Sequence, residues 1–199
     1  MAWNKYYLFV KSPKLTNINQ ILLKLGLAQY RPTRQAPLHC SNKPETLFTG
    51  FYKDSFPIIH PDLAFHFFEN ISSETEKLFL ATFPGSEIVA LIENSTVGLF
   101  GYAIIENGQK IRVREGSDGE IYHDAGALLP EERQMLAAEL FAEDEIEKMR
   151  EDGMSEEEVA AAIQFEASWR VPNLLTKRYL GETVGAIDTG EVPVMEYSL

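Results

Sequence analysis

The chain has 199 residues, 45% of them hydrophobic and 24% charged, and its formal net charge is −12 at pH 7. This length and composition suit one globular core and argue against global disorder, while the excess negative charge disfavours binding to nucleic acids and to anionic membranes. The longest apolar run, residues 97–105, is far shorter than the roughly twenty residues of a membrane-spanning helix. The single cysteine excludes an intrachain disulfide, and the N-terminus lacks the pattern of a secretory signal, so we expect a cytoplasmic protein.

The first quarter of the chain predicts a strand, a helix and an irregular segment. Residues 6–10 are aromatic and β-branched, which is typical of a strand. Between residues 15 and 25 the apolar side chains recur at helical spacing, and Gly26 follows as a stop signal. Residues 30–45 contain three prolines that disfavour regular pairing, so we expect no regular element there.

Two strand-like runs follow, at residues 46–52 and 56–60, with a tight turn between them. Pro57 cannot donate a ladder hydrogen bond, which favours an edge position for the second strand. The aromatic residues at 65–68 fit either a short helical turn or a further strand, and the sequence leaves both open. Ser73 then fits the N-cap of a helix that ends before a Pro-Gly pair.

The middle of the chain predicts a series of antiparallel strands. Asn107-Gly108 is the strongest hairpin signal, because both residues tolerate the positive φ angles of a type I′ turn. A second turn at residues 116–119 leads to a further short strand. The predicted strands cover residues 87–93, 98–106, 109–115 and 120–123.

The last third of the chain has helical periodicity. Pro130 suits the first turn of a helix that ends near Gly153, and Ser155 with Glu158 forms a capping box for a second helix. We expect the second helix to run to about Trp169, where Val171-Pro172 restricts continuation, and a further helical turn or two stays open at residues 174–179. The inward face of the first helix is predicted to hold Leu136, Leu140, Ile146 and Met149.

Strands dominate the first two thirds of the chain and helices the rest, which favours an α+β fold over a βαβ repeat. A final strand is expected at residues 192–197. We therefore expect a single α+β domain over residues 1–199, with an acidic helical segment at 130–169. Its mostly antiparallel sheet should have about six to eight strands, covered by about three or four helices.

Several glycines, turns and apolar positions from residue 46 onward carry a resemblance to a known family. They are an apolar strand ending near Gly50 and Phe51, Ser95, residues 98–103, Asn107-Gly108, Arg112, residues 116–119, Gly126, residues 129–132 and Leu180-Gly181. Over about residues 46–181, the chain resembles a family of uncharacterised bacterial proteins, a domain of unknown function. The resemblance implies a single α+β domain of bacterial type, and it brings no known activity.

The negative charge is concentrated in one segment. Residues 131–158 hold twelve carboxylates and three cations, so −9 of the net charge of −12 lies there. A carboxylate-rich helix can simply keep a protein soluble, but nine uncompensated charges repel one another, and a basic partner protein would relieve that cost. The predicted partner-binding side chains are Glu143, Asp144, Glu147 and Glu151.

Lys110, Arg112 and Arg114 alternate along one predicted strand, which would place them on one face of the sheet. Three neighbouring cations could bind a phosphate or a carboxylate ligand. The alternative is that they pair with acidic residues of the same hairpins, namely Glu106, Glu115, Glu120 or Asp124. Arg112 lies mid-strand and is the candidate that we select.

His60, Asp62 and His66 could act as metal ligands, and His123 could join them in space. Their spacing matches no specific metal template, so we expect neither a metal nor a cofactor. His60 and His123 remain candidate ligand-binding residues.

Glu166 is a further candidate ligand-binding or acid–base residue, although Arg170, four residues on, is a natural ion-pair partner. Cys40 beside His39 could be a thiolate nucleophile, but no family signature surrounds the pair, and an inert thiol is favoured.

These features predict a non-enzymatic, inhibitor- or immunity-like protein that binds a basic protein through an acidic helical face. The alternative is a small-molecule binding protein or an enzyme with a pocket near His60, Arg112 and His123. A homo-oligomer with an interface at residues 65–68 is the third hypothesis. The first hypothesis requires residues 131–158 to face solvent, and the second requires the candidate residues to converge on one cavity.

Overall fold

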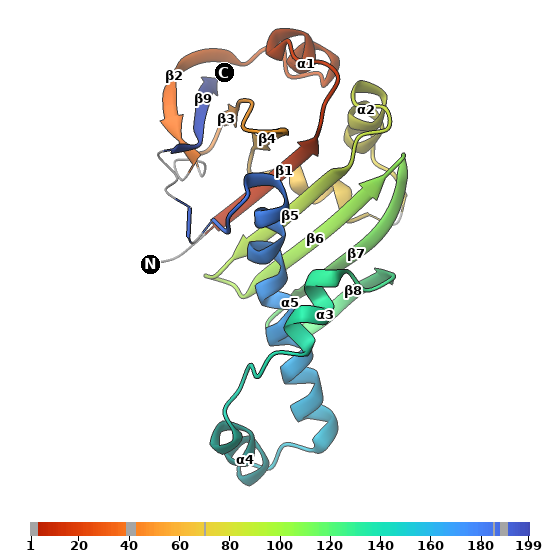
Figure 1. Cartoon of the computed structure of the whole chain (residues 1–199), viewed down its shortest axis with the longest axis vertical. Helices are drawn as coiled ribbons and strands as arrows, with labels where there is room; N and C mark the ends of the chain where they lie inside the picture. Colours follow the sequence, from red (N-terminus) through yellow and green to blue (C-terminus); the bar gives the residue numbers. More distant parts are fainter. Residues whose placement is uncertain (1–3, 39–42, 70, 185, 188–190) are drawn as a thin grey trace.

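The computed structural model describes residues 4–38, 43–69, 71–184, 186–187 and 191–199. These residues form nine strands of one sheet, five α-helices and a short 3-10 helix (Figure 1). The strands are β1 (Asn4–Lys11), β2 (Arg31–Pro37), β3 (Thr46–Thr49), β4 (Ser55–Ile59), β5 (Ile88–Asn94), β6 (Leu99–Glu106), β7 (Gln109–Ser117), β8 (Glu120–Gly126) and β9 (Pro193–Ser198). The helices are α1 (Ile18–Lys24), η2 (Ala64–Phe67), α2 (Glu74–Thr82), α3 (Pro130–Leu136), α4 (Glu143–Glu151) and α5 (Glu156–Leu180).

All neighbouring strands are antiparallel, in the order β2-β9-β3-β4-β1-β5-β6-β7-β8. The predicted α+β class with an antiparallel sheet is therefore confirmed, whereas the predicted numbers of strands and helices were too low. The additional strand is β2. The additional helix arises because the segment that begins at Pro130 forms two helices, α3 and α4. The Glu145 side chain accepts the N–H of Ala142, and this capping bond starts α4 as a separate helix.

β2 forms in the proline-containing segment that was predicted to be irregular. It is an edge strand of the sheet and pairs with β9 alone. Pro32 lies opposite Tyr197, where the register shifts, and Pro37 lies opposite Pro193 at the end of the strand. An edge strand makes ladder hydrogen bonds on one side only, so it tolerates residues that lack an N–H.

The predicted edge position of the strand that contains Pro57 was wrong, because β4 lies between β3 and β1. The β3–β4 ladder pairs Phe48 with Ile59 and Thr49 with Ile58, and it stops before Pro57. The carbonyl of Pro57 accepts a hydrogen bond from the Thr49 hydroxyl at 2.8 Å. In an antiparallel sheet, the N–H and C=O groups of one residue point to the same neighbouring strand. The carbonyl of Pro57 points to β3, so an N–H at this position would also point to β3, beyond the end of the β3–β4 ladder. The proline therefore removes no hydrogen bond from that ladder.

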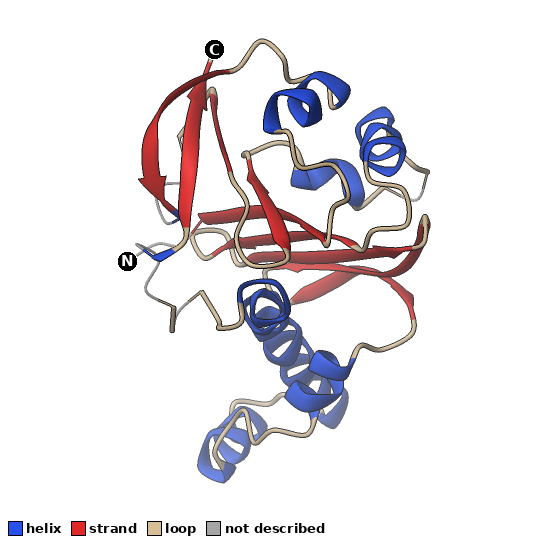
Figure 2. Cartoon of the chain, turned by 45° about the horizontal axis from the view of Figure 1, so that its top comes forward, coloured by secondary structure: helices blue, strands red, loops and turns tan. Residues whose placement is uncertain are grey.

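The sheet separates two buried clusters. In Figure 2, α1, η2 and α2 lie on one side of the sheet, while α3 and α5 lie on the other, and the strands at the β2 end run across those at the β8 end. On the α5 side, Tyr179 stacks on Phe9 of β1 with ring centroids 5.2 Å apart. On the α2 side, the predicted aromatic cluster forms the helical turn η2, in which Phe67 and Phe68 are buried in the chain's own core while Phe65 is partly exposed.

A tight turn and a β-bulge shape the β6–β7 hairpin. Asn107 and Gly108 have φ angles of 49° and 78°, which confirms the predicted turn. Beyond this turn the register shifts, so that Arg112 pairs with Ile104 but Lys110 pairs with Ile105. The extra residue, Ile111, forms a bulge, and side chains on its two sides no longer share one face.

The capping box that begins α5 is confirmed, since the Ser155 hydroxyl accepts the N–H of Glu158 and the Glu158 carboxylate accepts the N–H of Ser155. The predicted end of this helix before Pro172 was wrong, because α5 continues to Leu180. Pro172 has no N–H to donate to the carbonyl of Ser168. Burial of Val171, Leu175 and Tyr179 against the sheet offsets that missing bond.

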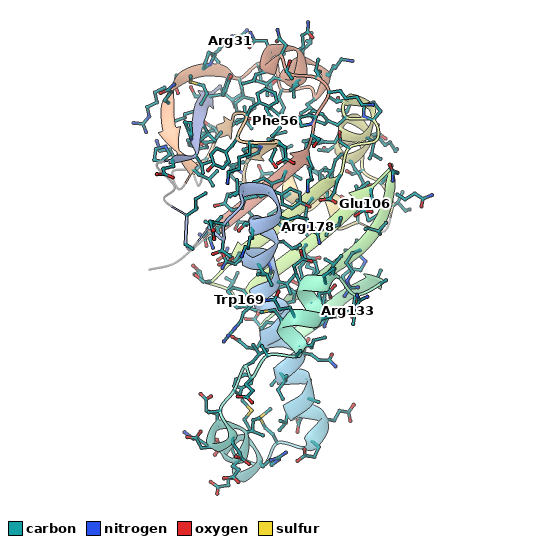
Figure 3. The ribbon with its side chains drawn as sticks, in the orientation of Figure 1. Arg31, Phe56, Glu106, Arg133, Trp169 and Arg178 are labelled. Carbon is teal, nitrogen blue, oxygen red and sulfur yellow. The ribbon has the colours of Figure 1, made fainter. Side chains whose placement is uncertain are left out.

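Residues 137–163 extend away from the sheet, and we refer to them as the acidic arm (Figures 1 and 3). The arm consists of a linker, α4 and the first turns of α5; no residue of α4 is buried. It carries ten carboxylates against two cations, a net charge of −8. None of the helices in the described part of the chain is long and apolar enough to cross a membrane.

Candidate functional site

Four charged side chains meet on the α5 side of the sheet, and we refer to them as the Arg112 cluster. Arg112 and Arg114 come from β7, Asp124 from β8 and Glu132 from the first turn of α3. The two arginines and Glu132 are buried, whereas the side chain of Asp124 is 48% exposed. Two guanidinium groups and two carboxylates give the cluster no net charge, which is the arrangement that buried ions require.

Arg112 is 1% exposed and is the most extensively bonded residue of the cluster. Its Nε and Nη2 donate to the two carboxylate oxygens of Glu132 at 2.8 and 2.6 Å, and its Nη1 donates to Asp124 Oδ1 at 2.6 Å. Nη1 also donates to the carbonyl of Ala125 at 2.9 Å. Burial alone would lower the pKa of Arg112, but the hydrogen bonds to Glu132 and Asp124 raise it above its ordinary value. All three nitrogens are engaged, so Arg112 holds α3 and β8 to β7 and offers little to a ligand.

Glu132 connects α3 to three other groups. Besides Arg112, it accepts the Tyr102 hydroxyl at 2.9 Å and the N–H of Leu129 at 2.8 Å. The bond from Leu129 caps the first turn of α3, which explains why an acidic residue stands at the third helical position after Leu129. Burial, followed by the charge of Glu132, raises the pKa of the Tyr102 hydroxyl well above its ordinary range.

Arg114 has fewer partners than Arg112. Its Nε donates to the Ser168 hydroxyl of α5 at 2.8 Å, and its Nη1 donates to Asp124 Oδ2. Its Nη2 has no hydrogen-bond partner among the described residues, although the residue is only 6% exposed. This guanidinium borders a pocket of about 230 Å³, which we refer to as the Arg114 pocket. The pocket is lined by Arg114, Asp124, Leu128, Glu132, Leu136, Gln164, Ala167, Ser168 and Val171.

Lys110 does not belong to this group of cations. The bulge turns it to the opposite face, where its Nζ lies 2.8 Å from Glu76 Oε2 of α2 and donates to the carbonyl of Glu69 at 2.9 Å. The predicted row of three cations on one face was therefore wrong. The predicted pairing with Asp124 is confirmed for Arg112 and Arg114.

His60 follows β4 and is held by two hydrogen bonds. Its Nδ1 accepts the N–H of Asp62 at 3.1 Å, so the neutral ring carries its proton on Nε2, which lies 2.9 Å from the Tyr30 hydroxyl. Burial lowers the pKa of His60 below its ordinary value; the charge of Asp62 opposes this shift and His66 adds to it. His66 itself is a partly exposed residue near Glu69, with 3.9 Å between Nδ1 and Oε1.

The lowered pKa of His60 predicts a pH-dependent loss of stability. Below about pH 6.5 the unfolded chain binds a proton at this residue while the folded protein stays neutral. We therefore expect the free energy of unfolding to decrease as the pH falls from 6.5 through the folded-state pKa of His60. Above pH 6.5, the contribution of neutral His60 to stability is fully present. Urea unfolding at a series of pH values measures it. His60→Gln should flatten this dependence; equal slopes in wild type and His60→Gln would contradict the assignment.

The candidate residues His60, Arg112 and His123 do not share one pocket. Four strand steps separate β4 from β7, or roughly 19 Å across the sheet. His123 of β8 lines a separate depression with Lys110 and Val113, on the face opposite to Arg112. No group of three or more possible metal ligands occurs among the described residues. The predicted cavity that joins these three residues is not formed by the described part of the chain.

Glu166 forms the intrahelical ion pair with Arg170, with 2.7 Å between Oε1 and Nε. Arg170 borders a wide, open depression of about 450 Å³ beside Trp169, and Lys5 and Glu93 on the same depression pair at 3.0 Å. The charged groups of this depression are thus already matched. Cys40 and His39 lie outside the described residues.

The predicted partner-binding residues lie together on the acidic arm. Glu143, Asp144, Glu147 and Glu151 are all exposed on α4. Of the arm's other carboxylates, Glu145 caps α4, Glu156 pairs with Arg150 at 2.7 Å, and Glu158 caps α5. The carboxylates without an ion pair or a hydrogen bond to the described residues are Glu139, Glu143, Asp144, Glu147, Glu151, Asp152 and Glu157.

The sequence did not point to Glu132, Arg114 and Ser168 as parts of one site. A signal for Glu132 existed, because Pro130 marks the first helical position and a glutamate two residues later can cap the helix. A buried arginine also requires a carboxylate from some other element. The contact between Arg114 and Ser168 joins residues 54 positions apart, and no local pattern encodes it.

In comparisons with known proteins, the chain matches no protein-family model, no curated protein and no solved structure. The resemblance to a family of uncharacterised bacterial proteins therefore stays a prediction. Function has to be argued from the geometry of the arm and of the Arg112 cluster.

Proposed function

We propose that this protein binds a basic partner protein through the acidic arm, without catalysing a reaction itself. The observation that supports the proposal is the exposure of seven arm carboxylates that have no ion pair or hydrogen bond to the described residues. Glu131 and Glu132, at the start of the acidic segment, lie outside the arm; they point inward and pair with Arg178 at 2.7 Å and Arg112 at 2.6 Å. Within the acidic segment, the unmatched carboxylates therefore all lie on the arm.

The arm adds little to the core of the protein. α4 has no buried residue, and among the secondary-structure elements its main contact is α5. In residues 137–163 only Val159 is buried. A segment that is not held by a core and whose charges repel one another is costly to keep folded, and binding of a cationic surface would remove that repulsion.

The geometry also favours a protein over a small ligand as the partner. Four of the seven unmatched carboxylates lie on α4, and the others lie on the rest of the arm, which projects from the sheet (Figure 3); none of the seven lines a pocket described above. An extended charged surface of this kind accelerates the encounter with an oppositely charged protein, and its effect decreases with ionic strength.

The proposal predicts that neutralising α4 abolishes capture of a basic protein. The quadruple variant Glu143→Gln, Asp144→Asn, Glu147→Gln and Glu151→Gln removes four exposed charges without touching the core. Immobilised wild-type protein should retain one or more basic proteins from an extract of the source cells at low ionic strength. The variant should retain about tenfold less of them, because several exposed ion pairs are lost together.

A matched control variant changes the total charge by the same amount outside the acidic arm. It replaces four exposed glutamates that have no ion pair with described residues by glutamine, namely Glu45, Glu120, Glu182 and Glu191. This control should retain the same basic proteins as wild type. Equal loss in the control and the α4 variant would show a nonspecific effect of net charge, and retention of only neutral or acidic proteins would refute the proposal.

A further inference from the structure

The Arg114 pocket is bordered by a guanidinium whose N–H groups are not all bonded to described residues. Arg114 has five N–H groups, of which the described residues use one on Nε and one on Nη1. The guanidinium borders the pocket, and its unused N–H groups are not among the buried unsatisfied side-chain atoms of the described residues, so they can donate to water or to a ligand in the pocket. A ligand that displaces this water keeps the hydrogen bond only if it presents an acceptor oxygen.

The charge of the surroundings restricts what that occupant can be. The positive charges of Arg112 and Arg114 are already balanced by Asp124 and Glu132, so an anion would find no uncompensated cation. It would also approach a chain of net charge −12, past an arm of net charge −8. A cation in the pocket would lie beside the positively charged guanidinium of Arg114 and would be repelled by it. A neutral acceptor such as a carbonyl group avoids both the repulsion of an anion and the repulsion of a cation.

The walls of the pocket require an apolar group beside that carbonyl. Leu128 and Leu136 are 41% and 42% exposed, and Ala167 and Val171 continue the apolar wall from α5. Covering the leucine side chains removes apolar surface from water, which favours binding. A volume of about 230 Å³ corresponds to roughly seven or eight water molecules, which suits a ligand of the size of one amino-acid residue.

Acceptors for a ligand N–H lie on the same wall. The side chain of Gln164 is exposed at the pocket and has no hydrogen-bond partner among the described residues. The carbonyl of Ser168 lacks its usual helical donor, because Pro172 stands four residues later. A donor on Arg114 together with these acceptors complements an amide group, which has one C=O and one N–H.

We infer that the Arg114 pocket binds a neutral amide that carries a short aliphatic side chain. The carbonyl oxygen accepts from Nη2 of Arg114, and the aliphatic group covers Leu128 and Leu136. Such an amide can belong to a free small molecule or to an apolar residue of a polypeptide. The inference does not depend on the acidic arm, so a failure of the proposed function leaves it intact.

The test uses two probes of nearly equal size, N-acetyl-leucinamide and N-acetyl-leucine, which differ by the negative charge of the carboxylate. Titration of ¹⁵N-labelled protein with the neutral amide should shift the Arg114 side-chain signal and the backbone amides of Ala167, Ser168 and Val171 in a saturable way. The carboxylate should bind about tenfold more weakly, because its negative charge is repelled by the acidic chain and no unbalanced cation of the cluster attracts it.

Substitution of Arg114 could unfold the cluster, so the decisive variant is made at the exposed pocket residue. Gln164→Phe places a ring at the mouth of the pocket and should weaken binding of N-acetyl-leucinamide about tenfold or more. The matched control, Gln20→Phe, makes the same change at an exposed position of α1 on the other side of the sheet, and should bind like wild type. Equal binding of the two probes, shifts outside the pocket, or undiminished binding to Gln164→Phe would overturn the inference.

A third probe distinguishes the two sources of the amide. The peptide N-acetyl-Leu-Gly-Lys-Lys-amide adds cations that can reach the arm. Tighter binding of this peptide than of N-acetyl-leucinamide, lost in the α4 quadruple variant, supports the inference with a polypeptide as the source. Equal binding of the two supports it with a small amide as the source.

Discussion

Replacement of Glu132 by alanine is expected to lower the free energy of unfolding by about 3–5 kcal/mol, the cost typical of removing one partner of a buried ion pair. The substitution leaves Arg112, at 1% exposure, without the bidentate carboxylate that occupies its Nε and Nη2. It also removes the acceptor of the buried Tyr102 hydroxyl and of the Leu129 N–H at the start of α3. Urea unfolding followed by circular dichroism measures the loss.

The neighbouring residue provides the matched control. Glu131 stands in the same turn of α3 and also pairs with an arginine, Arg178, but both side chains are partly exposed, at 16% and 21%. Glu131→Ala should therefore cost much less, about 1 kcal/mol, because water can solvate the arginine that remains. Equal effects of the two substitutions would show that burial of the Arg112 cluster is not what stabilises α3.

Gly126→Ala is expected to destabilise the protein by about 3 kcal/mol or more. Gly126 ends β8 with a φ angle of +92°, where an L side chain is strained by about 1–3 kcal/mol. A Cβ atom at this position would also lie 2.0 Å from the carbonyl oxygen of Ile111, in the bulge of β7. The backbone would have to move apart there, and overpacking of this kind costs a further ~1–3 kcal/mol.

Gly119 separates these two effects. Its φ angle is +87°, nearly the same as that of Gly126, but a Cβ atom there meets nothing within 4 Å. Gly119→Ala should therefore cost only the backbone strain, about 1–3 kcal/mol, without the further cost of the close contact. Chemical unfolding of both variants, with amide hydrogen exchange of β7 and β8, tests the difference. If the two variants lose the same stability, the close contact with Ile111 is not what requires glycine at position 126.

The elements with strong local signals could be predicted from the sequence. The Asn107-Gly108 turn and the Ser155–Glu158 capping box appear where their patterns indicated, because both depend on contacts within four residues. The exposure of Glu143, Asp144, Glu147 and Glu151 likewise agrees with their charge, since isolated carboxylates are rarely buried.

The candidate site was only partly predictable. Asp124 was one of four acidic residues of the same hairpins that the sequence offered as partners of the cations, and the sequence did not distinguish among the four. Glu132 and Ser168 come from helices that follow the sheet, and their pairing with Arg112 and Arg114 depends on how those helices pack. One extra residue in β7, Ile111, also moved Lys110 to the other face, because a single bulge reverses the alternation of side chains.

Local sequence patterns were enough to predict the α+β class, the antiparallel hairpins and an exposed acidic helix, because hydrophobic period, turn residues and charge act over a few neighbouring positions. The other features depend on packing between distant segments. This packing placed β9 between β2 and β3, extended α5 past Pro172 and brought one arginine, two carboxylates and a serine to one pocket. Those outcomes depend on burial against distant segments, whose free energy exceeds the local preferences of proline or of a single charged residue.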